Sequence, residues 1–530
     1  MPALTPRTAA RLSVVEQHEF YKAATSRRPD ERGGLIGAYT HAPRTSVTLG
    51  ATHACLLPQA GLLQVADRRR GSSIIPFGRH LAFGADPGTS MSIAWQTPAL
   101  VDAPFVRLGD SPTNFGEKTP AETRIVSTMA AVSAPLELQG PSASKSIVQY
   151  YLHAVLNGLE PGTTYYYVVG HIGLSPEKSL EGIHAFTTAP GKSRSSGFTF
   201  TAFGDHGVSR EAAAVTNQVR GFNPAFHLHA GDISYADPIG SGRITSSYDP
   251  RVWDAYFTQI ENVAGSIPWQ VTTGNHDIEP WYGSNGYDGQ FARFDFPAGK
   301  QTWYSFTYGN VAVISLDAND ISHEYVGNTG YSGGAQAAWL RERLATYRTA
   351  VDIDFIVVQF HYCAYCSSTD HASDGGVRTD WVPLFDQYSV DLVINGHNHL
   401  YERTDALIGG RVSKVLPIGG TAESAADGTV YVTVGTAGHG LSAFTAADSY
   451  DGCIREFSEV TSYCSHYSGD EVTWTTETVD WSRVRYAGYC LLRVDVLPGG
   501  PGGTSTLRVA SVNEFGTELD SFSIVRAVAR

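Results

Sequence analysis

Apolar runs in the middle of the chain end, one after another, at residues that can bind a metal ion. The segments FTFTAFGDHG, WQVTTGNHD, FIVVQFH and VDLVINGHNH show this pattern, and so does the run ending at Leu228, which HAGDISY follows. Fully apolar runs that alternate with helical patterns predict the buried strands of an α/β sheet covered on both faces. Because ligands of such sheets gather where the strands end, we expect these residues to meet.

The ends of these runs supply donors of several chemical types. They are Asp205, Asp232, Tyr235, Asn275, His361, His397 and His399. Each one alone is weak evidence, because Gly-Asp-x-Gly is an ordinary turn and a histidine after a strand is commonly structural. Carboxylate and phenolate oxygens suit a hard trivalent ion, whereas imidazoles and an amide oxygen suit a divalent ion. Together these donors are enough for two metal ions.

The expected α/β elements follow a linker at 189–197. A strand is expected at 198–203, then a helix at 209–218 that Ser209 caps and that has Glu211 in its first turn. Further strands are predicted at 225–229, 268–272, 311–316, 355–360 and 392–394, with a helix at 335–347. The tail has antiparallel strand patterns at 489–496, 507–509 and 521–525, which we expect to close one edge of the sheet.

Period-two alternation precedes the linker. Strand patterns occur at 80–83, 91–95, 105–108, 148–155, 165–169 and 183–186, and they predict an antiparallel β-sandwich with Trp95 and Tyr165 in its core. No cluster of reactive residues accompanies them, so the expected role of the sandwich is packing and positioning. The domain prediction is an extension of unknown role at 1–75 with a helix candidate at 9–24, the sandwich at 76–190 and a catalytic domain at 197–530.

Charge and hydropathy narrow the classes of partner. The 530 residues carry a formal net charge of −14, which argues against nucleic acid, since phosphate backbones are bound through clustered Lys and Arg. No apolar run reaches the roughly 18 residues that a membrane span needs. Residues 1–40 show no apolar segment of a signal peptide, so the sequence itself leaves the location open.

The chain has six cysteines, an even number that permits disulfides without requiring them. Cys363 and Cys366 form a CxxC pair typical of redox or zinc sites, but no second CxxC exists to complete a thiolate zinc site. We therefore favour a disulfide that braces the loop after His361 over free thiols. Cys453 and Cys464 lie in a loop where a disulfide is also possible.

The motifs carry a family resemblance. Gly204-Asp-His-Gly207, Gly231-Asp-Ile-Ser-Tyr235, Gly274-Asn-His-Asp277, Val358-Gln-Phe-His361 and Gly396-His-Asn-His399 resemble the sequence blocks of the purple acid phosphatases, which are binuclear metallophosphoesterases. Tyr235 is the specific feature, because it separates this family from the wider superfamily. The resemblance runs from about His80 to the C-terminus. It implies a fibronectin-III-like β-sandwich followed by an α/β metallophosphoesterase sandwich domain with a C-terminal strand segment.

The resemblance also implies a ligand set. Fe(III) would be held by Asp205, Tyr235 and His399, and a divalent ion (zinc, iron or manganese) by Asn275, His361 and His397. Asp232 would bridge both ions. In the family, charge transfer from the tyrosinate to iron colours the protein.

Other residues match family positions next to the metal ions. His276 and His371 stand where family members place histidines that contact phosphate or protonate the leaving group, and Asn275 also faces substrate. An exposed loop histidine is the alternative for His371, and Asp370 replaces a histidine of the plant members, which leaves the substrate range open. His206 either contacts phosphate or has a supporting role. Asp277 and Glu402 are candidates for supporting the ligands.

The implied activity is that of an acid phosphatase. Phosphate monoesters would be hydrolysed by direct attack of a metal-bound hydroxide, without a phosphoenzyme. A phosphodiesterase using the same metal centre is the alternative. A non-catalytic interaction protein is disfavoured, because an inactive scaffold should have lost a ligand and none is missing. The expected partners are small phosphate esters, and the resemblance favours a secreted or periplasmic location.

Overall fold

The computed structural model describes residues 74–130, 145–174, 176, 182–191, 197–245, 247–371, 373–444, 460–468 and 471–528. All of them belong to one unit, Val65–Arg530. The helix expected at 9–24 lies outside the described residues.

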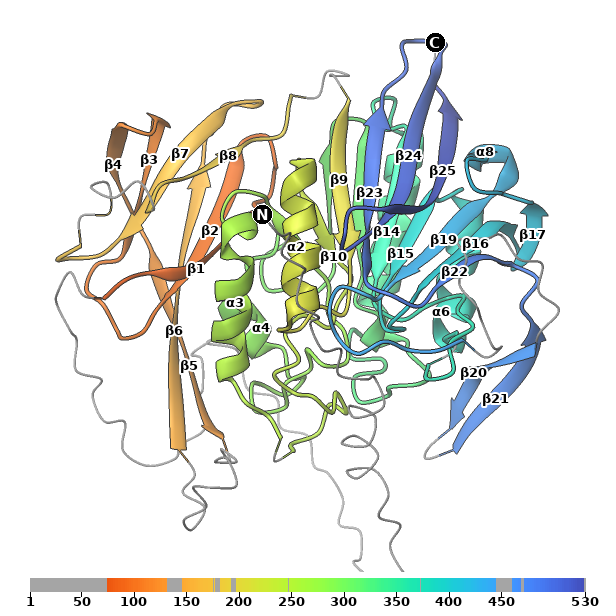
Figure 1. Ribbon diagram of the computed structural model, residues 1–530, viewed down its shortest axis with the longest axis horizontal. Helices are drawn as coiled ribbons and strands as arrows, with labels where there is room; N and C mark the ends of the chain where they lie inside the picture. Colours follow the sequence, from red (N-terminus) through yellow and green to blue (C-terminus); the bar gives the residue numbers. More distant parts are fainter. Residues whose placement is uncertain are drawn as a thin grey trace, which may run out of the picture. The chain divides into compact units, whose positions relative to one another are not determined.

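The N-terminal part is a β-sandwich (orange to yellow in Figure 1). Its strands are β1 (Phe77–Phe83), β2 (Ser90–Thr97), β3 (Phe105–Ser111), β4 (Asn114–Pro120), β5 (Glu122–Ala130), β6 (Lys145–Asn157), β7 (Thr164–Gly170) and β8 (His184–Thr187). They form two four-stranded sheets, in the orders β1-β2-β6-β5 and β4-β3-β7-β8. Trp95 is fully buried in the core, as expected, and Tyr165 is partly buried and packs against this core. The sequence did not reveal β4, because its side chains are mostly exposed and lack apolar alternation.

The first sheet of the catalytic part combines its first strands with the tail. Its order is β11 (Trp269–Val271), β10 (His227–His229), β9 (Phe198–Phe203), β23 (Cys490–Leu497), β24 (Thr504–Asn513), β25 (Glu518–Ala527) and β18 (Thr421–Glu423). Strands β9, β10 and β11 are parallel, and β23 pairs antiparallel with β9. The tail therefore extends this sheet beside β9.

The second sheet carries the other expected strands. Its order is β12 (Tyr304–Tyr308), β13 (Val311–Ser315), β14 (Phe355–Phe360), β15 (Leu392–Asn395), β19 (Thr429–Val434), β16 (Tyr401–Ile408) and β17 (Arg411–Lys414), and β22 (Ser482–Tyr486) also pairs with β16. Strands β13, β14, β15 and β19 are parallel. A separate hairpin joins β20 (Val460–Ser468) and β21 (Glu471–Thr478).

Helices flank both sheets. They are α2 (Arg210–Phe222), α3 (Arg251–Ala264), α4 (Asp288–Arg293), α5 (Ala335–Thr349), α6 (Gly375–Asp380), α7 (Val382–Gln387) and α8 (Ser424–Asp427), with a 3-10 turn at Ala318–Asp320. The Ser209 side chain caps α2 by accepting from the Ala212 amide at 2.9 Å, which confirms the expected helix start. Among the described residues, no helix is both long and apolar enough to cross a membrane.

The two catalytic sheets pack face to face, which confirms the sandwich domain that the family resemblance implied. The apolar strand pattern by itself had indicated one sheet with cover on both sides. Val313 and Val357 of the second sheet share a core with Phe200 of the first. The opposite face of the second sheet, including Val358, packs in a separate core with Leu340 of α5. A strand that is apolar on both faces does not distinguish cover by a helix from cover by another sheet, so the sequence pattern fitted both.

Polar contacts tie the sandwich to the catalytic part. The carboxylate of Asp295, just after α4, accepts from His153 of β6 at 2.8 Å and lies 2.8 Å from the Arg124 guanidinium of β5. Ser92 of β2 donates to the same carboxylate. This cluster holds three sandwich strands, β2, β5 and β6, against the loop that follows α4.

Candidate metal centre

All the predicted donors follow the carboxyl ends of parallel strands. Asp205 follows β9, Asp232 and Tyr235 follow β10, Asn275 follows β11, His361 follows β14, and His397 and His399 follow β15. Backbone hydrogen bonds join the loops: the Asp205 amide donates to the Gly231 carbonyl at 3.0 Å, and the Gly396 amide donates to the His361 carbonyl at 3.0 Å. Donors from two sheets thereby meet along one edge of the domain.

One cluster consists of Asp205, Tyr235 and His399. The Tyr235 hydroxyl lies 3.2 Å from Asp205 Oδ1 and 3.0 Å from His399 Nε2. His399 Nε2 lies 3.3 Å from the same Asp205 oxygen. Three donor atoms therefore face one another, with the anionic oxygen chemistry that a hard cation prefers.

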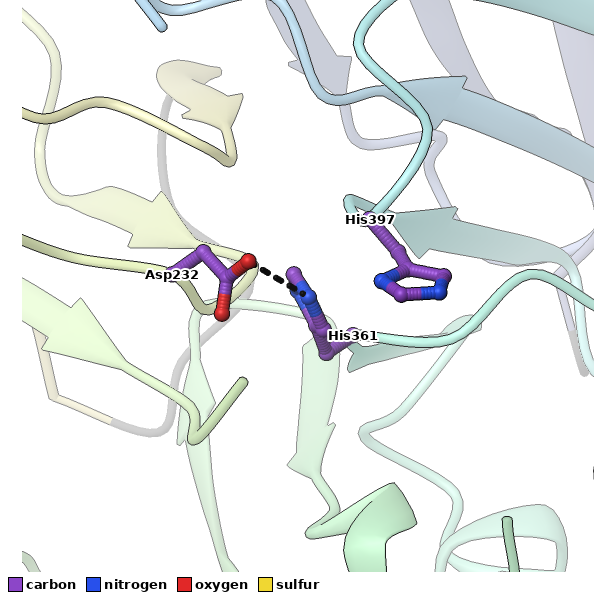
Figure 2. Close-up of side chains that lie close together, drawn as sticks. All are labelled: Asp232, His361 and His397. Carbon is purple, nitrogen blue, oxygen red and sulfur yellow. Dashed lines mark ion pairs between the residues drawn. The ribbon is translucent and has the colours of Figure 1, made fainter. Parts of the chain in front are cut away.

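A second cluster consists of Asp232, His361 and His397. One ligand atom from each lies within 4.8 Å of the others, and Figure 2 shows the three side chains converging from separate loops. His361 Nε2 lies 3.1 Å from Asp232 Oδ2 and 3.2 Å from Asn275 Oδ1. This set of two imidazoles, a carboxylate and an amide oxygen has the composition of a divalent metal site.

The backbone is strained at these donors. Asp205 (φ 57°), Asp232 (φ 52°), Tyr235 (φ 58°) and His397 (φ 69°) all occupy the left-handed region, which side chains other than glycine rarely adopt. Such strain costs of order 1–3 kcal/mol per residue and concentrates at functional sites. A turn at these positions does not itself require a tyrosine or a histidine. We therefore interpret the strained backbone as fixing the direction in which these side chains point.

Glycines before the donors let the loops approach one another. A Cβ at Gly231 would lie 2.7 Å from His361 Nδ1 and 2.8 Å from the Gly274 amide nitrogen. A Cβ at Gly204 would lie 3.0 Å from the Gly396 Cα. Gly204 and Gly231 therefore allow close packing of the donor loops.

The electrostatics of the donor set favour a cation. Burial of His361 opposes its charged form, but the carboxylates of Asp232 and Asp205 outweigh that effect and raise the pKa of His361 to about 10. Burial also raises the pKa of Tyr235 well above its ordinary value, and the charges of Asp205 and Asp232 raise it further. A phenolate is stable in such surroundings only beside a positive charge, so the residues present fit bound metal ions.

Asp277 and Glu402 support the loops without facing the clusters. Asp277 accepts from the backbone amides of Asp232 (2.9 Å), Ile233 (3.0 Å) and Gly274 (2.8 Å). Glu402 accepts from the backbone and hydroxyl of Ser367, both at 2.7 Å. Their contacts agree with the supporting role expected from the sequence.

His276 and His371 border the clusters. The His276 ring centroid lies 4.4 Å from that of Tyr235, and its Nδ1 lies 2.6 Å from the Asp237 carbonyl. His371 is 26% exposed, and its ring centroid lies 4.1 Å from that of His397. Both rings therefore lie close enough to the two clusters to contact a molecule bound there.

His206 lies elsewhere, which corrects its expected contact with phosphate. Its side chain is fully buried and stacks on Phe203, with ring centroids 4.8 Å apart. Its Nε2 lies 2.8 Å from the Thr216 hydroxyl of α2. His206 is therefore part of the core and not of the donor clusters.

The expected disulfide after His361 is also corrected. Cys363 and Cys366 are free, buried thiols. The Cys363 thiol donates to the Gly396 carbonyl at 3.0 Å and accepts from the Asn398 side chain at 3.2 Å, so it fixes the loop that carries His397 and His399. Cys453 lies outside the described residues, and its pairing with Cys464 stays a prediction.

Two residues of this site have no counterpart among the residues predicted from the sequence. His439 stacks on Tyr235, and it follows β19 in the segment VYVTVGTAGHG, which has the same pattern of an apolar run before a donor. Glu324 lies 2.6 Å from His371 Nδ1 and 3.0 Å from His397 Nε2. It lies well beyond the end of the apolar strand β13, inside the loop that follows it, so no local signal identifies it. Burial alone would raise the pKa of Glu324, but the charges of His397 and His371 and their hydrogen bonds lower it to about 2.

Known proteins share this architecture. A family model described as "Purple acid Phosphatase, N-terminal domain" matches residues 76–188, and one described as "Calcineurin-like phosphoesterase" matches residues 198–401. An uncharacterized protein of Mycobacterium tuberculosis, Rv2577, is 31% identical and is matched over 86% of this chain and 89% of its own length. Purple acid phosphatase 23 of Arabidopsis thaliana is 30% identical over 54% of this chain and 62% of its own.

A solved structure has the same fold. The purple acid phosphatase PPD1 from yellow lupin (Lupinus luteus) seeds matches with a TM-score of 0.63 and 21% identity, over 86% of this chain and 75% of that one. The fold and the clustered donors define a metallophosphoesterase, a hydrolase of phosphate esters. Within that class, the chain belongs to the purple acid phosphatase family, whose members use a binuclear metal centre.

Proposed function

We propose that this protein is an acid phosphatase that hydrolyses phosphate monoesters at a centre of Fe(III) and a divalent zinc, iron or manganese ion. Asp205, Tyr235 and His399 would hold the ferric ion. Asn275, His361 and His397 would hold the divalent ion, and Asp232 would be shared by both ions. The observation that carries the proposal is the convergence of these donors into two adjacent clusters of different chemistry.

The metal ions, when bound, supply a water of lowered pKa and a clamp for the oxygens of an in-line displacement. The protein's own side chains supply orientation and a proton. His276 contacts the phosphate together with Asn275. His276 lies beside Asp232, and Asn275 lies beside His361 of the same cluster. His371 is partly exposed and donates a proton to the leaving oxygen. His206 takes no part, because it is buried in the core.

The domain division at 76–190 and 197–530 is part of this proposal. The sandwich contributes no residue to the donor clusters described above, and its contacts with the catalytic part are structural. We therefore assign the chemistry to the second domain alone.

The test uses the purified full chain. Elemental analysis and a visible spectrum are followed by assays with p-nitrophenyl phosphate and bis(p-nitrophenyl) phosphate at acidic and neutral pH. The proposal predicts bound iron, a visible band that Tyr235→Phe abolishes while the fold persists, and faster hydrolysis of the monoester in acid. Preferred cleavage of the diester would indicate a phosphodiesterase, and a metal-free protein inert to both esters would indicate a non-catalytic role.

A further inference from the structure

The carboxylate of Glu324 lies between two histidines of the site. Its Oε1 is 2.6 Å from His371 Nδ1, and its Oε2 is 3.0 Å from His397 Nε2. The Glu324 side chain is only 19% exposed, and that of His397 only 2%. One carboxylate therefore engages a predicted metal ligand with one oxygen and the predicted proton donor with the other.

This arrangement determines where the ring hydrogens lie. An ionised carboxylate only accepts hydrogen bonds, so both ring nitrogens that face Glu324 carry a hydrogen. His397 then keeps the Nδ1 lone pair for a metal ion, and Figure 2 shows one of its ring nitrogens turned toward Asp232 and His361. In the same way His371, bound through Nδ1, leaves its Nε2 for the substrate.

The loop of Glu324 is anchored. Asp374 Oδ2 accepts from the Ser322 hydroxyl (2.9 Å) and from the amides of His323 (3.0 Å) and Glu324 (3.2 Å). Its Oδ1 accepts from the first amides of α6, those of Gly376 (2.8 Å) and Val377 (3.1 Å). Because Asp374 follows His371 by only a few residues, it holds the segments of Glu324 and His371 in one geometry.

We propose that Glu324 is a positioning residue that fixes the tautomers of His397 and His371 together, and so couples metal affinity to proton donation. The proposal rests on the proposed function above. A cation bound by Glu324, His371 and His397 is the alternative for the same donors, which lie within 4.8 Å of one another. In that case His397 would have to bind metal through both nitrogens and lose both ring hydrogens, so the hydrogen-bonded arrangement is favoured.

Glu324→Gln disrupts one of the two histidine contacts while the side chain keeps nearly the same size and shape. The amide has one acceptor oxygen, so it serves only one of the two histidines and presents its NH2 group to the other. We expect the affinity of the divalent position for Zn(II), measured by competition with a chelator, to fall about 10- to 100-fold. Glu324→Asp keeps the carboxylate and should recover part of this loss.

Substrates with different leaving groups report on His371. Loss of general acid catalysis typically costs about 10²–10⁴-fold, and a good leaving group such as p-nitrophenolate needs the proton least. Glu324→Gln at saturating Zn(II) should therefore lower kcat for a simple alkyl phosphate at least ten-fold more than kcat for p-nitrophenyl phosphate. His371→Ala should reproduce this selective loss without changing the Zn(II) affinity.

Glu342→Gln is the matched control, because Glu342 is a 68% exposed carboxylate on α5. It should match the wild type in both measurements. Unchanged Zn(II) affinity and unchanged leaving-group selectivity in a folded Glu324→Gln protein would overturn the inference. A wild type that binds Zn(II) but hydrolyses no ester would instead refute the proposed function, and the affinity measurement would still test the link between Glu324 and His397.

Discussion

The Tyr235 and His439 rings are stacked, with centroids 3.6 Å apart and an angle of 8° between their planes. Stacked pairs of rings contribute about 0.5–1.5 kcal/mol beyond their buried area. Since Tyr235 also has a strained backbone (φ 58°), we expect the stack to help hold its phenol ring in place. His439→Ala should shift or weaken the visible band and lower iron affinity by about 2- to 10-fold, as measured by spectroscopic titration.

His439→Phe is the control, because it keeps a flat ring against Tyr235. It should retain the band of the wild type. Equal spectra for the alanine variant and the wild type would show that the stack does not position the phenol.

Asp232→Ala should empty both metal positions, since Asp232 is the only proposed shared ligand. Its Oδ2 lies 3.1 Å from His361 Nε2, and its Oδ1 accepts from the His276 amide at 2.9 Å. Elemental analysis after gel filtration should show metal falling from about two ions per chain to a trace. Asp480→Asn, at an exposed turn, should keep the full content, and retention of either ion by Asp232→Ala would argue against a bridging role.

Gly231→Ala should be destabilising and should lower metal content. The added Cβ would lie 2.7 Å from His361 Nδ1, and the backbone at Gly231 has φ 84°. Gly299 has a similar φ of 78° but open space around a Cβ, so Gly299→Ala measures the backbone strain alone. We expect about 1 kcal/mol for Gly299→Ala in urea unfolding, and at least about 2 kcal/mol more for Gly231→Ala. Equal losses would mean that the close approach to His361 carries no cost.

The ionisation of Asp295 should make the free energy of unfolding depend on pH. Burial alone would raise its pKa, but the charges of His153 and Arg124 hold it well below the usual range. A depressed pKa in the folded state gives stability that is present above the ordinary pKa and is lost as the pH falls through the folded value. Asp295→Asn should therefore lower the free energy of unfolding by about 2 to 3 kcal/mol at neutral pH.

The same comparison at low pH completes this test. The difference between Asp295→Asn and the wild type should shrink progressively below about pH 4 in chemical denaturation. A difference that is constant with pH would show that the charge of Asp295 does not hold the sandwich to the catalytic part.

The donors could be predicted from the sequence because each follows a continuous apolar run. The strand at 198–203 matches β9 in full, and Asp205 follows its end with only Gly204 between them. The helix after Ser209 could be predicted as well, because its cap and first turn are local signals. Trp253, Tyr256 and Phe257 have the helical spacing of α3, so that missed helix was also readable.

Other features depend on tertiary contacts. Nothing local indicates that Glu324 reaches His371, since that contact joins loops 47 positions apart in the sequence. The burial of His206 depends on its contacts with Phe203 and Thr216, which the sequence pattern does not specify. The free thiol of Cys363 is explained by its hydrogen bond to Gly396 in a distant loop. The sequence pattern therefore predicted the donors that the structure brings together, whereas their neighbours Glu324, His206 and Cys363 required the fold.

A metal titration of hydrolysis tests the binuclear centre most directly. Protein stripped with a chelator is given Fe(III) and Zn(II) in increasing amounts, and the rate of p-nitrophenyl phosphate hydrolysis in mild acid is followed. We predict no activity before addition and a linear rise that saturates at about two metal ions per chain. Activity that survives stripping, or that saturates with a single ion, would contradict a binuclear phosphatase centre.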